Sequence, residues 1–464
     1  MKKRIKVLFD ATILNNFYSK DSGRTGIFWT SFRLLDAMSK REDLDIYLYS
    51  PNMVETMKFV DDFADKIPHL KICSGDIKKM DVHFSPVFKT ADKIRKTGIP
   101  CFYILHDCIP NVCPEYFNDG IGWFYDFAKS LTEKDYGFSN SNYTTADFLK
   151  FYPKLDAQKI VTIPLSTNQT YKPNKKLTLK VRKKYNIPTD KKYLFSLCSL
   201  EPRKNLIRSV RTFIKFIEKN KIDDLVFVLG GGAWNGFIEK FEKEVPEYAE
   251  YKNKIIRAGY VDDEDMNALY SNAEWFVYTS QYEGFGMPPL EAMSCGCPVI
   301  TSNNSSLPEV VGDAGIMIDY DSDEQHIEAY EKYYFDEKFR KKMAQKGLKR
   351  SKLFSWDKAA EIIANGFKKC NQPENRKSLN INEFLWESVH IKLFNSFPLF
   401  KIIENGNKQK ILLFNLIPFM SCKEKPTKKI WRIFGIPFFK IRHKSAVTTK
   451  YYLLGMPLFK VTRK

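Results

Sequence analysis

The sequence lacks several features that define large classes of protein. Its longest apolar run, Ile411 to Met420, has ten residues, whereas a membrane-spanning helix needs about 20. The N-terminal segment MKKRIKVLFDATIL is interrupted by Asp10 and has nothing that resembles a cleavage site, so it predicts a buried first strand rather than a signal peptide. We therefore expect a chain that does not cross a membrane on its own.

Metal ligands are also scarce. The chain has six His and nine Cys, and the cysteines are irregularly spaced and odd in number. No zinc-binding pattern forms from them. We interpret the cysteines as thiols of a reducing cytoplasm that form no disulfides, and we predict no metal site.

Acidic residues are nearly absent from the C-terminal region. Between Ile391 and Lys464 only Glu404 and Glu424 oppose the many Lys and Arg, so most of the net charge of +19 lies in this tail. The rest of the chain is close to balanced. Because a single core stops growing near about 250–300 residues, the 464 residues predict two main domains and an appendage.

Short apolar segments alternate with helical patterns over the first 320 residues or so. The expected strands are Ile5–Phe9, Asp45–Tyr49, Asp81–Phe84, Phe102–Leu105, Tyr136–Ser139, Ile160–Pro164, Tyr193–Leu197, Leu225–Leu229, Ile255–Gly259, Trp275–Tyr278, Pro298–Thr301 and Gly315–Ile318. Such alternation predicts parallel sheets built from βαβ units, here an α/β protein with two doubly wound domains. We place them at residues 1–170 and 171–370, with a helix from Phe354 to Lys368 closing the second.

A linker at 371–390 precedes a repeated segment at 391–464. The copies LFNSFPLFK, LFNLIPFMS, IFGIPFFK and LLGMPLFK place a proline at 398, 418, 437 and 457. A period of about 20 residues is typical of stacked units. Each copy predicts two short strands around a turn.

Polar residues follow several of the expected strands. His106 follows CFYIL, Glu201 follows YLFSLCS and Glu283 follows WFVYTS. Because parallel sheets bind ligands at the carboxyl ends of their strands, these residues are expected to face one cleft between the two domains.

The motif Glu201-Pro-Arg-Lys-Asn205 has the chemistry to hold a diphosphate. Arg203 supplies a planar fork and Lys204 a point charge. Fixed cations stabilise the charge that develops on a leaving phosphate oxygen. The motif by itself fits a solvated start of a helix equally well.

The segment EGFGMPPLE combines a glycine turn with the start of a helix. Gly284 and Gly286 allow close approach of a ligand, and the helix start offers N–H groups to a phosphate. Glu283 and Glu291 are eight residues apart, which is about 12 Å along a helix. A retaining glycosidase needs its carboxylates about 5–5.5 Å apart. The two glutamates therefore suit opposite ends of one elongated ligand, such as a sugar and a ribose, unless they are solvated acids beside a tight turn.

These motifs, with GGGAW and RAGYVDDEDMNALYSNAEWFVYTSQYEGFGMPPLEAMSCGCPVITSNNSSLPEVVGDAG, resemble the retaining glycosyltransferases of family 4. The likeness is strongest to the mannosyltransferase-like branch that builds bacterial surface polysaccharides. It is dense over 193–320, looser over 1–165 and absent from the repeats. It implies the GT-B fold, with two Rossmann-like domains facing a cleft. It also implies a hexosyltransferase that moves a sugar, with mannose favoured, from GDP-mannose or a UDP-sugar to a glycan or lipid-linked acceptor.

The resemblance also implies residue roles on the donor side. Arg203 and Lys204 bind the donor diphosphate, and Glu283 lies beside the donor sugar. The donor contacts are completed by Phe285, Gly286, Leu290 and Glu291, of which Glu291 holds the ribose. The family needs no divalent metal, and no Asp-x-Asp stands at a matching position, so we expect no cofactor besides the nucleotide-sugar.

The first domain is expected to contribute His106 and a glycine loop. In the pattern HDxIPxxxPEYF, His106 matches the family residue that faces the donor sugar, so Arg203, Lys204, Glu283 and His106 form the expected catalytic set. Without that pattern a packed histidine would be the simpler interpretation. Gly23 and Gly26 in DSGRTGI resemble the loop at which the acceptor and phosphate approach, although an ordinary loop fits them nearly as well. The family also implies front-face attack, in which the leaving phosphate takes the acceptor proton.

The basic, aromatic tail fits three kinds of partner: an anionic membrane surface, nucleic acid, or only itself as a solvated repeat. We favour the membrane and expect no nucleic acid, so the protein would be cytoplasmic and peripheral at the inner face of the cytoplasmic membrane. Two other functions compete with sugar transfer, a GT-B sugar-nucleotide epimerase and a non-catalytic membrane- or glycan-binding protein. The intact donor motifs argue against both.

Overall fold

The computed structural model describes residues 4–18, 25–67, 69–73, 75–116, 121–168, 170–174, 179–232 and 237–371, and eight strands between 388 and 462. The chain divides into two units, residues 1–379 and 380–464. Among the helices described, none combines the length and the hydropathy that a membrane span requires.

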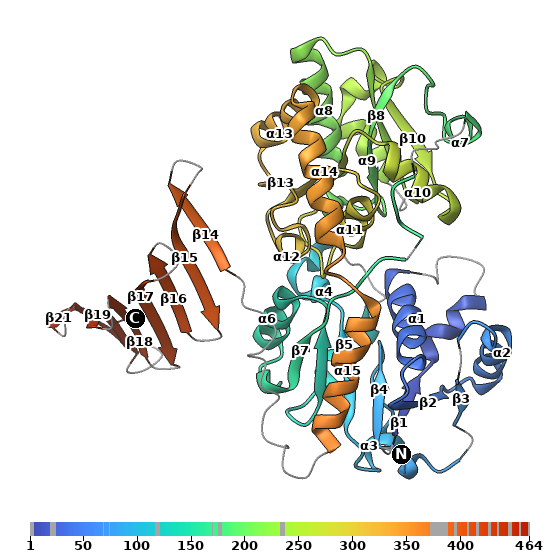
Figure 1. The fold of residues 1–464 in the computed structure, drawn as a ribbon, viewed down its shortest axis with the longest axis vertical. Helices are drawn as coiled ribbons and strands as arrows, with labels where there is room; N and C mark the ends of the chain where they lie inside the picture. Colours follow the sequence, from blue (N-terminus) through green and yellow to red (C-terminus); the bar gives the residue numbers. More distant parts are fainter. Residues whose placement is uncertain are drawn as a thin grey trace. The chain divides into compact units, whose positions relative to one another are not determined.

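A seven-stranded parallel sheet forms the centre of the first domain (Figure 1), in the order β3-β2-β1-β4-β5-β6-β7. Its strands are β1 (Ile5–Asp10), β2 (Leu44–Tyr49), β3 (Lys71–Ile72), β4 (Val82–Ser85), β5 (Cys101–Leu105), β6 (Tyr136–Ser139) and β7 (Ile160–Thr162). The helices are α1 (Gly26–Ser39), α2 (Met53–Phe63), α3 (Asp92–Arg95), α4 (Ile109–Val112), α5 (Gly122–Ser130) and α6 (Asn142–Phe151). Every residue of the central strand β4 is buried, as expected for a parallel sheet that is covered on both faces.

The second domain is built on a six-stranded parallel sheet in the order β10-β9-β8-β11-β12-β13. Its strands are β8 (Lys192–Leu197), β9 (Leu225–Gly230), β10 (Ile255–Gly259), β11 (Phe276–Tyr278), β12 (Val299–Ser302) and β13 (Gly315–Ile318). The helices are α7 (Leu179–Lys184), α8 (Leu206–Asn220), α9 (Phe237–Glu244), α10 (Asp263–Asn272), α11 (Met287–Ser294), α12 (Leu307–Val311), α13 (Asp323–Phe335) and α14 (Glu337–Ser351). All the expected strands are present, and the α/β fold with two doubly wound domains is confirmed. The short β3 was missed because two residues carry no periodic pattern.

The last helix, α15 (Trp356–Asn371), packs differently from the expectation. It was expected to close the second domain, but it lies along the first sheet (Figure 1). Phe367 packs on Phe84, Phe102 and Phe138 with ring centroids 4.8–6.2 Å apart. The pattern of apolar residues in α15 specified a helix with one apolar face, whereas the sheet that receives this face is decided by tertiary packing.

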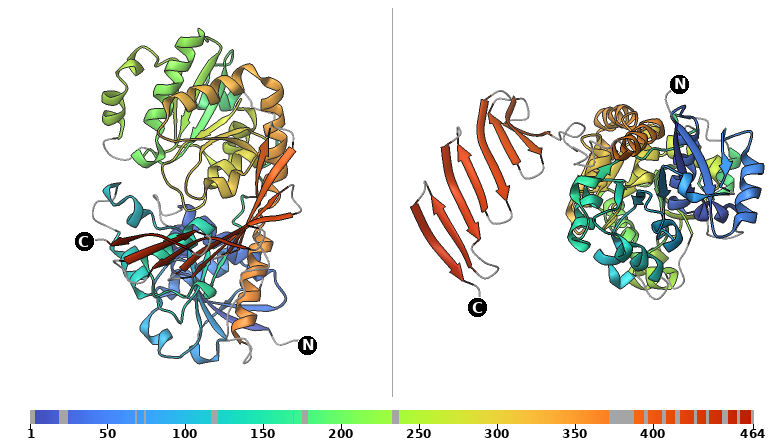
Figure 2. Two further views of the ribbon diagram at one scale, coloured as in Figure 1. Left: turned by 90° about the vertical axis from the view of Figure 1, so that its left-hand side faces the viewer. Right: turned by 90° about the horizontal axis from the view of Figure 1, so that it is seen from below.

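The second unit is one antiparallel sheet whose strands follow one another in chain order. We call it the tail sheet. Its strands are β14 (Ser388–Leu393), β15 (Phe397–Asn405), β16 (Lys408–Leu413), β17 (Ile417–Lys425), β18 (Lys428–Ile433), β19 (Ile436–His443), β20 (Thr448–Leu453) and β21 (Met456–Thr462). Figure 2 shows them as a single layer. Each proline of the repeat is the second residue of one of the strands β15, β17, β19 and β21. The register with the preceding strand shifts just after it, as in a β-bulge.

Candidate active site

Two loops of the second domain bring three charged side chains together. The turn Pro202–Lys204 follows β8, and Glu283 follows β11, the neighbouring strand. Glu283 Oε1 accepts hydrogen bonds from Arg203 Nη1 at 3.0 Å and from Lys204 Nζ at 2.6 Å. The hydroxyl of Tyr278, the last residue of β11, donates a third at 3.0 Å. Two sequence motifs 80 residues apart therefore form one cluster.

Glu283 is ionised although it is buried. Its exposed fraction is 8%, and burial alone raises the pKa of a carboxyl group. The charges of Lys204 and Arg203 outweigh this effect and lower the pKa of Glu283 to about 2. A fixed negative charge consequently lies at the carboxyl end of β11 at neutral pH.

Arg203 is engaged on both terminal nitrogens. Its Nη2 donates to Glu201 Oε1 at 2.9 Å, and its Nη1 also donates to the carbonyl oxygen of Tyr282. The two cations and two carboxylates of the cluster balance, so the positive charge that the sequence motif suggests is already compensated. Lys204 has three N–H groups, and the described contacts use two of them, on Glu283 and Tyr278.

The geometry of the turn after Glu283 requires glycine at positions 284 and 286. Gly286 has a φ of +108°, and a Cβ there would lie 2.7 Å from Leu307. At Gly284 a Cβ would collide with the carbonyl oxygen of His106. Phe285 packs on Phe354, with ring centroids 5.8 Å apart, and the Leu290 side chain is buried in the core. Any donor contact of Leu290 would therefore come from its backbone.

Hydrogen bonds from the first domain hold this turn in place. The carbonyl oxygen of Gly284 accepts from Ser141 Oγ at 2.8 Å and from Thr144 Oγ1 at 3.2 Å. In the other direction, Glu309 of the second domain accepts the backbone N–H groups of Asn142 and Tyr143 at the start of α6. The segment that carries Glu283 is thus bonded to both domains.

His106 lies at this junction, at the carboxyl end of β5. Its Nε2 is 2.8 Å from the carbonyl oxygen of Pro86, which makes Nε2 the protonated nitrogen of a neutral ring. Burial lowers the pKa of His106 to about 4. The imidazole is therefore uncharged at neutral pH. The backbone of His106 lies against Gly284, so the structure brings His106 and the Glu283 turn together.

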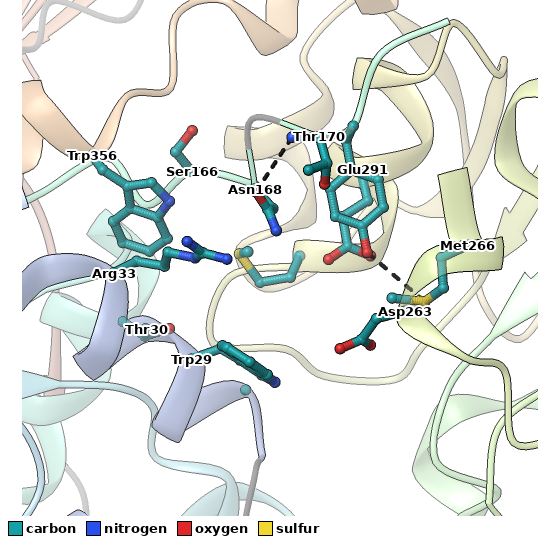
Figure 3. A pocket seen from close by; sticks show the side chains of 13 residues that line it. Trp29, Thr30, Arg33, Ser166, Asn168, Thr170, Asp263, Met266, Glu291 and Trp356 are labelled. Carbon is teal, nitrogen blue, oxygen red and sulfur yellow. Dashed lines mark hydrogen bonds between the residues drawn. The ribbon is translucent and has the colours of Figure 1, made fainter. Parts of the chain in front are cut away.

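Glu291 occupies a separate environment on α11. It lines a cavity together with Gly26, while Gly23 falls outside the described residues. Figure 3 shows Trp29 and Arg33 of α1 on one side of this cavity and Glu291 and Asp263 on the other. Burial raises the pKa of Glu291 to about 7, even though the hydroxyl of Tyr270 donates to its Oε2 at 2.9 Å.

Several residues of these two sites were missed by the sequence analysis. Tyr278 ends a strand beside Glu283, and that position could have identified it. Asp107 stood beside His106 in the sequence motif but received no role there; burial raises its pKa while Arg203 and Glu283 act on it with opposite signs. Tyr270 and Asp263 lie on α10, where no local pattern distinguishes them from other helical residues.

A cluster of three acidic residues at the start of α10 has the spacing of metal ligands. Carboxylate oxygens of Asp262, Glu264 and Asp265 lie within 4.8 Å of one another. Lys184 pairs with Asp262 and Asp265 at 2.5 Å each, so an ammonium group already compensates this cluster. The absence of a metal requirement stays a prediction.

Comparison with solved structures identifies the fold. The complex of Anabaena Alr3699/HepE with UDP and glucose superposes with a TM-score of 0.59 at 16% identity, covering 79% of this chain and all of that one. WaaG, a glycosyltransferase involved in lipopolysaccharide biosynthesis, gives 0.55 at 16% identity over 78% of this chain and 98% of its own. Two parallel sheets of this kind, with loops of both domains meeting at Glu283, are the GT-B fold of glycosyltransferases.

Sequence comparison places the chain within that class. Residues 178–350 match the family model of glycosyl transferases group 1. O-antigen chain mannosyltransferase B of Escherichia coli is 33% identical over 267 residues, covering 57% of this chain and 68% of that protein. The serotype-specific mannosyltransferase WbdA of the same species is 31% identical over 192 residues, 41% of this chain but 23% of its own length. The chain belongs to the group 1 glycosyltransferases, and it resembles their family 4, mannosyltransferase-like branch.

Proposed function

We propose that the protein is a retaining hexosyltransferase that moves mannose from GDP-mannose to a glycan or lipid-linked acceptor in the synthesis of a surface polysaccharide. The observation that carries the donor side is the placement of Glu283 between Arg203 and Lys204 at the junction of the two domains. The choice of mannose is supported by the mannosyltransferases among the relatives.

The residues of the cluster would act on the diphosphate and the sugar. Lys204, with an N–H group beyond those on Glu283 and Tyr278, would donate to the leaving phosphate as its charge develops. Glu283 would lie beside the donor sugar and keep Lys204 oriented. His106 is neutral and would act as a hydrogen-bond partner of the sugar rather than as an acid. Retention would follow from front-face attack, in which the leaving phosphate accepts the acceptor proton.

The cavity at Glu291 would take the nucleoside end of the donor. The Glu291 carboxyl group can accept hydrogen bonds from the ribose hydroxyls. The side chains of Trp29 and Trp356 give the cavity aromatic walls. A panel of nucleotide sugars and nucleoside diphosphates in a thermal-shift assay tests this. A ligand at 100 times its Kd stabilises by about 2.7 kcal/mol. GDP-mannose is expected to give the largest shift, and a larger shift with a UDP-sugar would contradict the proposed donor.

Hydrolysis of the donor in the absence of acceptor tests the cluster itself. Lys204→Ala and Glu283→Ala should lower the rate by about 100-fold or more, the size of losing one fixed charge partner of a transition state. Lys254→Ala is a matched control, because Lys254 is a poorly exposed lysine of the same domain that pairs with a carboxylate of Asp223. Equal rates in all four proteins would refute the donor site.

The tail would attach the enzyme to the anionic inner face of the cytoplasmic membrane. Each cation near such a surface contributes about 1 kcal/mol, and the tail is rich in them. Co-sedimentation with vesicles of phosphatidylcholine and phosphatidylglycerol should recover the full chain, whereas deletion of 391–464 should release it with donor hydrolysis intact. Undiminished binding of the shortened chain would exclude this role for the tail.

A further inference from the structure

The register of the tail sheet separates its residues onto two faces. Residues paired across neighbouring strands lie on the same face, and alternate residues along one strand do so too. Beginning at the hairpin ends, the pairs Leu393–Phe397, Leu413–Ile417, Ile433–Ile436 and Leu453–Met456 share one face. The pairings of Phe400 with Leu413, Met420 with Ile433 and Phe439 with Leu453 carry this face across the whole sheet. We call it the apolar face.

The next row on the apolar face has the same character. It consists of the pairs Ile391–Phe400, Ile411–Met420, Trp431–Phe439 and Tyr451–Phe459. Two consecutive rows in all four repeats are therefore aliphatic or aromatic. An apolar surface of this extent is covered in a soluble protein, and the described residues of the second unit form one layer only.

The cations of the tail sheet occupy the opposite face. With the exception of Lys429, every Lys and Arg of the eight strands lies there: Lys392, Lys401, Lys408, Lys410, Lys423, Lys425, Lys428, Arg432, Lys440, Arg442, Lys450 and Lys460. We call it the cationic face. A bilayer that received the apolar face would leave these cations one sheet thickness away from its anionic headgroups, so one bilayer cannot satisfy both faces.

We propose that the apolar face packs against the same face of a second copy of this chain. Two sheets that pack face to face through apolar rows are a standard way to form a core, and a two-fold axis needs only one self-complementary surface. The cationic faces would then lie on the two outer sides of the sandwich, one of them available to the anionic membrane of the proposed function.

The size of the apolar face suits a stable dimer. The eight strands, at about 4.8 Å spacing and with about five residues each at 3.4 Å, give a face of about 650 Å². Two such faces bury about 1,300 Å², within the 1,200–2,000 Å² of standard interfaces. The first unit has no comparable surface among its described residues, because its exposed large hydrophobic side chains are scattered over many elements, from Val54 on α2 to Phe335 on α13.

Sedimentation velocity of the full chain over a range of micromolar concentrations tests the proposal. The wild-type protein should be dimeric. Ile411→Asp and Trp431→Asp, on the apolar face, should raise the dissociation constant roughly 100-fold or more, since each buries an unpaired charge. The matched controls are Leu412→Asp and Ile430→Asp. These are the adjacent residues in the same two strands, placed on the cationic face, and they should remain dimeric.

Three results would overturn the proposal. One is a wild-type chain that is monomeric at every concentration. Another is an equal effect of both pairs of variants, which would mean that they unfold the sheet rather than separate two copies. The third is a monomeric wild type whose vesicle binding is lost only in the apolar-face variants, which would assign that face to the bilayer. Donor hydrolysis should be unchanged in all four variants, so failure of the dimer and failure of the proposed reaction are distinguishable.

Discussion

Glu283 and Glu291 stand at the two ends of one sequence motif, the first buried and the second partly buried, yet the structure gives them opposite charge behaviour. The pKa of Glu283 is lowered to about 2 and that of Glu291 is raised to about 7. Burial raises both. The difference comes from their neighbours, since Glu283 has Lys204 and Arg203 within 3.0 Å, whereas the hydrogen bond described for Glu291 comes from a neutral hydroxyl, that of Tyr270.

This contrast separates two tasks that one elongated donor requires. A fixed charge beside two cations suits the end of the ligand at which charge develops. A carboxyl group whose pKa lies near neutral pH can accept a hydrogen bond, or donate one when protonated. This suits a neutral sugar such as ribose. The contrast is therefore a more specific feature of this chain than the spacing of the two acids.

The largest expected effect comes from a substitution that removes the charge of Glu283. Glu283→Gln removes the charge but keeps the shape, and it leaves Arg203 and Lys204 buried with less compensation. Breaking a buried ion pair from one side costs about 3 kcal/mol or more, and donor hydrolysis should fall at least about 100-fold. Urea unfolding and the hydrolysis rate measure the two effects.

Glu331→Gln provides the control for this substitution. Glu331 pairs with Lys219 at the surface of the same domain, where an ion pair contributes about 0–1 kcal/mol. If the two substitutions cost the same stability, the Glu283 cluster is no stronger than a surface pair, and the electrostatic side of the comparison is wrong.

The next effect is the pH dependence that Glu291 imposes on stability. A carboxyl group whose folded pKa is raised from 4.5 to about 7 stabilises fully below pH 4.5 and loses that contribution as the pH rises to 7. The loss amounts to about 3 kcal/mol, at 1.36 kcal/mol per pKa unit. Glu283 acts in the opposite direction, because its stabilisation is present above pH 4.5 and is lost as the pH falls toward 2.

Unfolding free energies of wild type and Glu291→Gln between pH 5 and 8 measure this directly. The wild type should become less stable relative to the variant as the pH rises, since the amide does not ionise. Parallel curves for the two proteins would show that Glu291 is ionised throughout, like Glu283, and the contrast between them would disappear.

Much of this arrangement could be predicted from the sequence, but the contrast could not. Apolar runs located the strands, and the motifs located Arg203, Lys204 and Glu283 at strand ends, because element type and strand ends are encoded locally. Their partners are not. Tyr270 reaches Glu291 from another helix, and α15 packs on the first sheet instead of the second. Each depends on packing between segments that carry no mutual signal.

A smaller effect is expected from removing the tyrosine hydroxyl that donates a hydrogen bond to each acid. Tyr270→Phe removes the hydroxyl that stabilises ionised Glu291, so the pKa of Glu291 should rise further and the midpoint of its pH dependence should move upward. Tyr278→Phe removes one of three donors to Glu283, and the two cations should keep that acid ionised. Each substitution should cost about 1–2 kcal/mol. The midpoint should move only in Tyr270→Phe, and an equal shift in both would mean that the cations do not dominate at Glu283.

The smallest expected effect is that of a chelator. If Lys204 and Arg203 neutralise the donor diphosphate, as the contrast with Glu291 suggests, donor hydrolysis should continue unchanged in excess EDTA. A divalent ion bound to the diphosphate would neutralise the same charge, and the protein charges around Glu283 would then be far less important. Loss of activity in EDTA with recovery on Mg²⁺ would therefore move the source of charge stabilisation from the protein to the metal, and Lys204→Ala should then cost much less than about 100-fold.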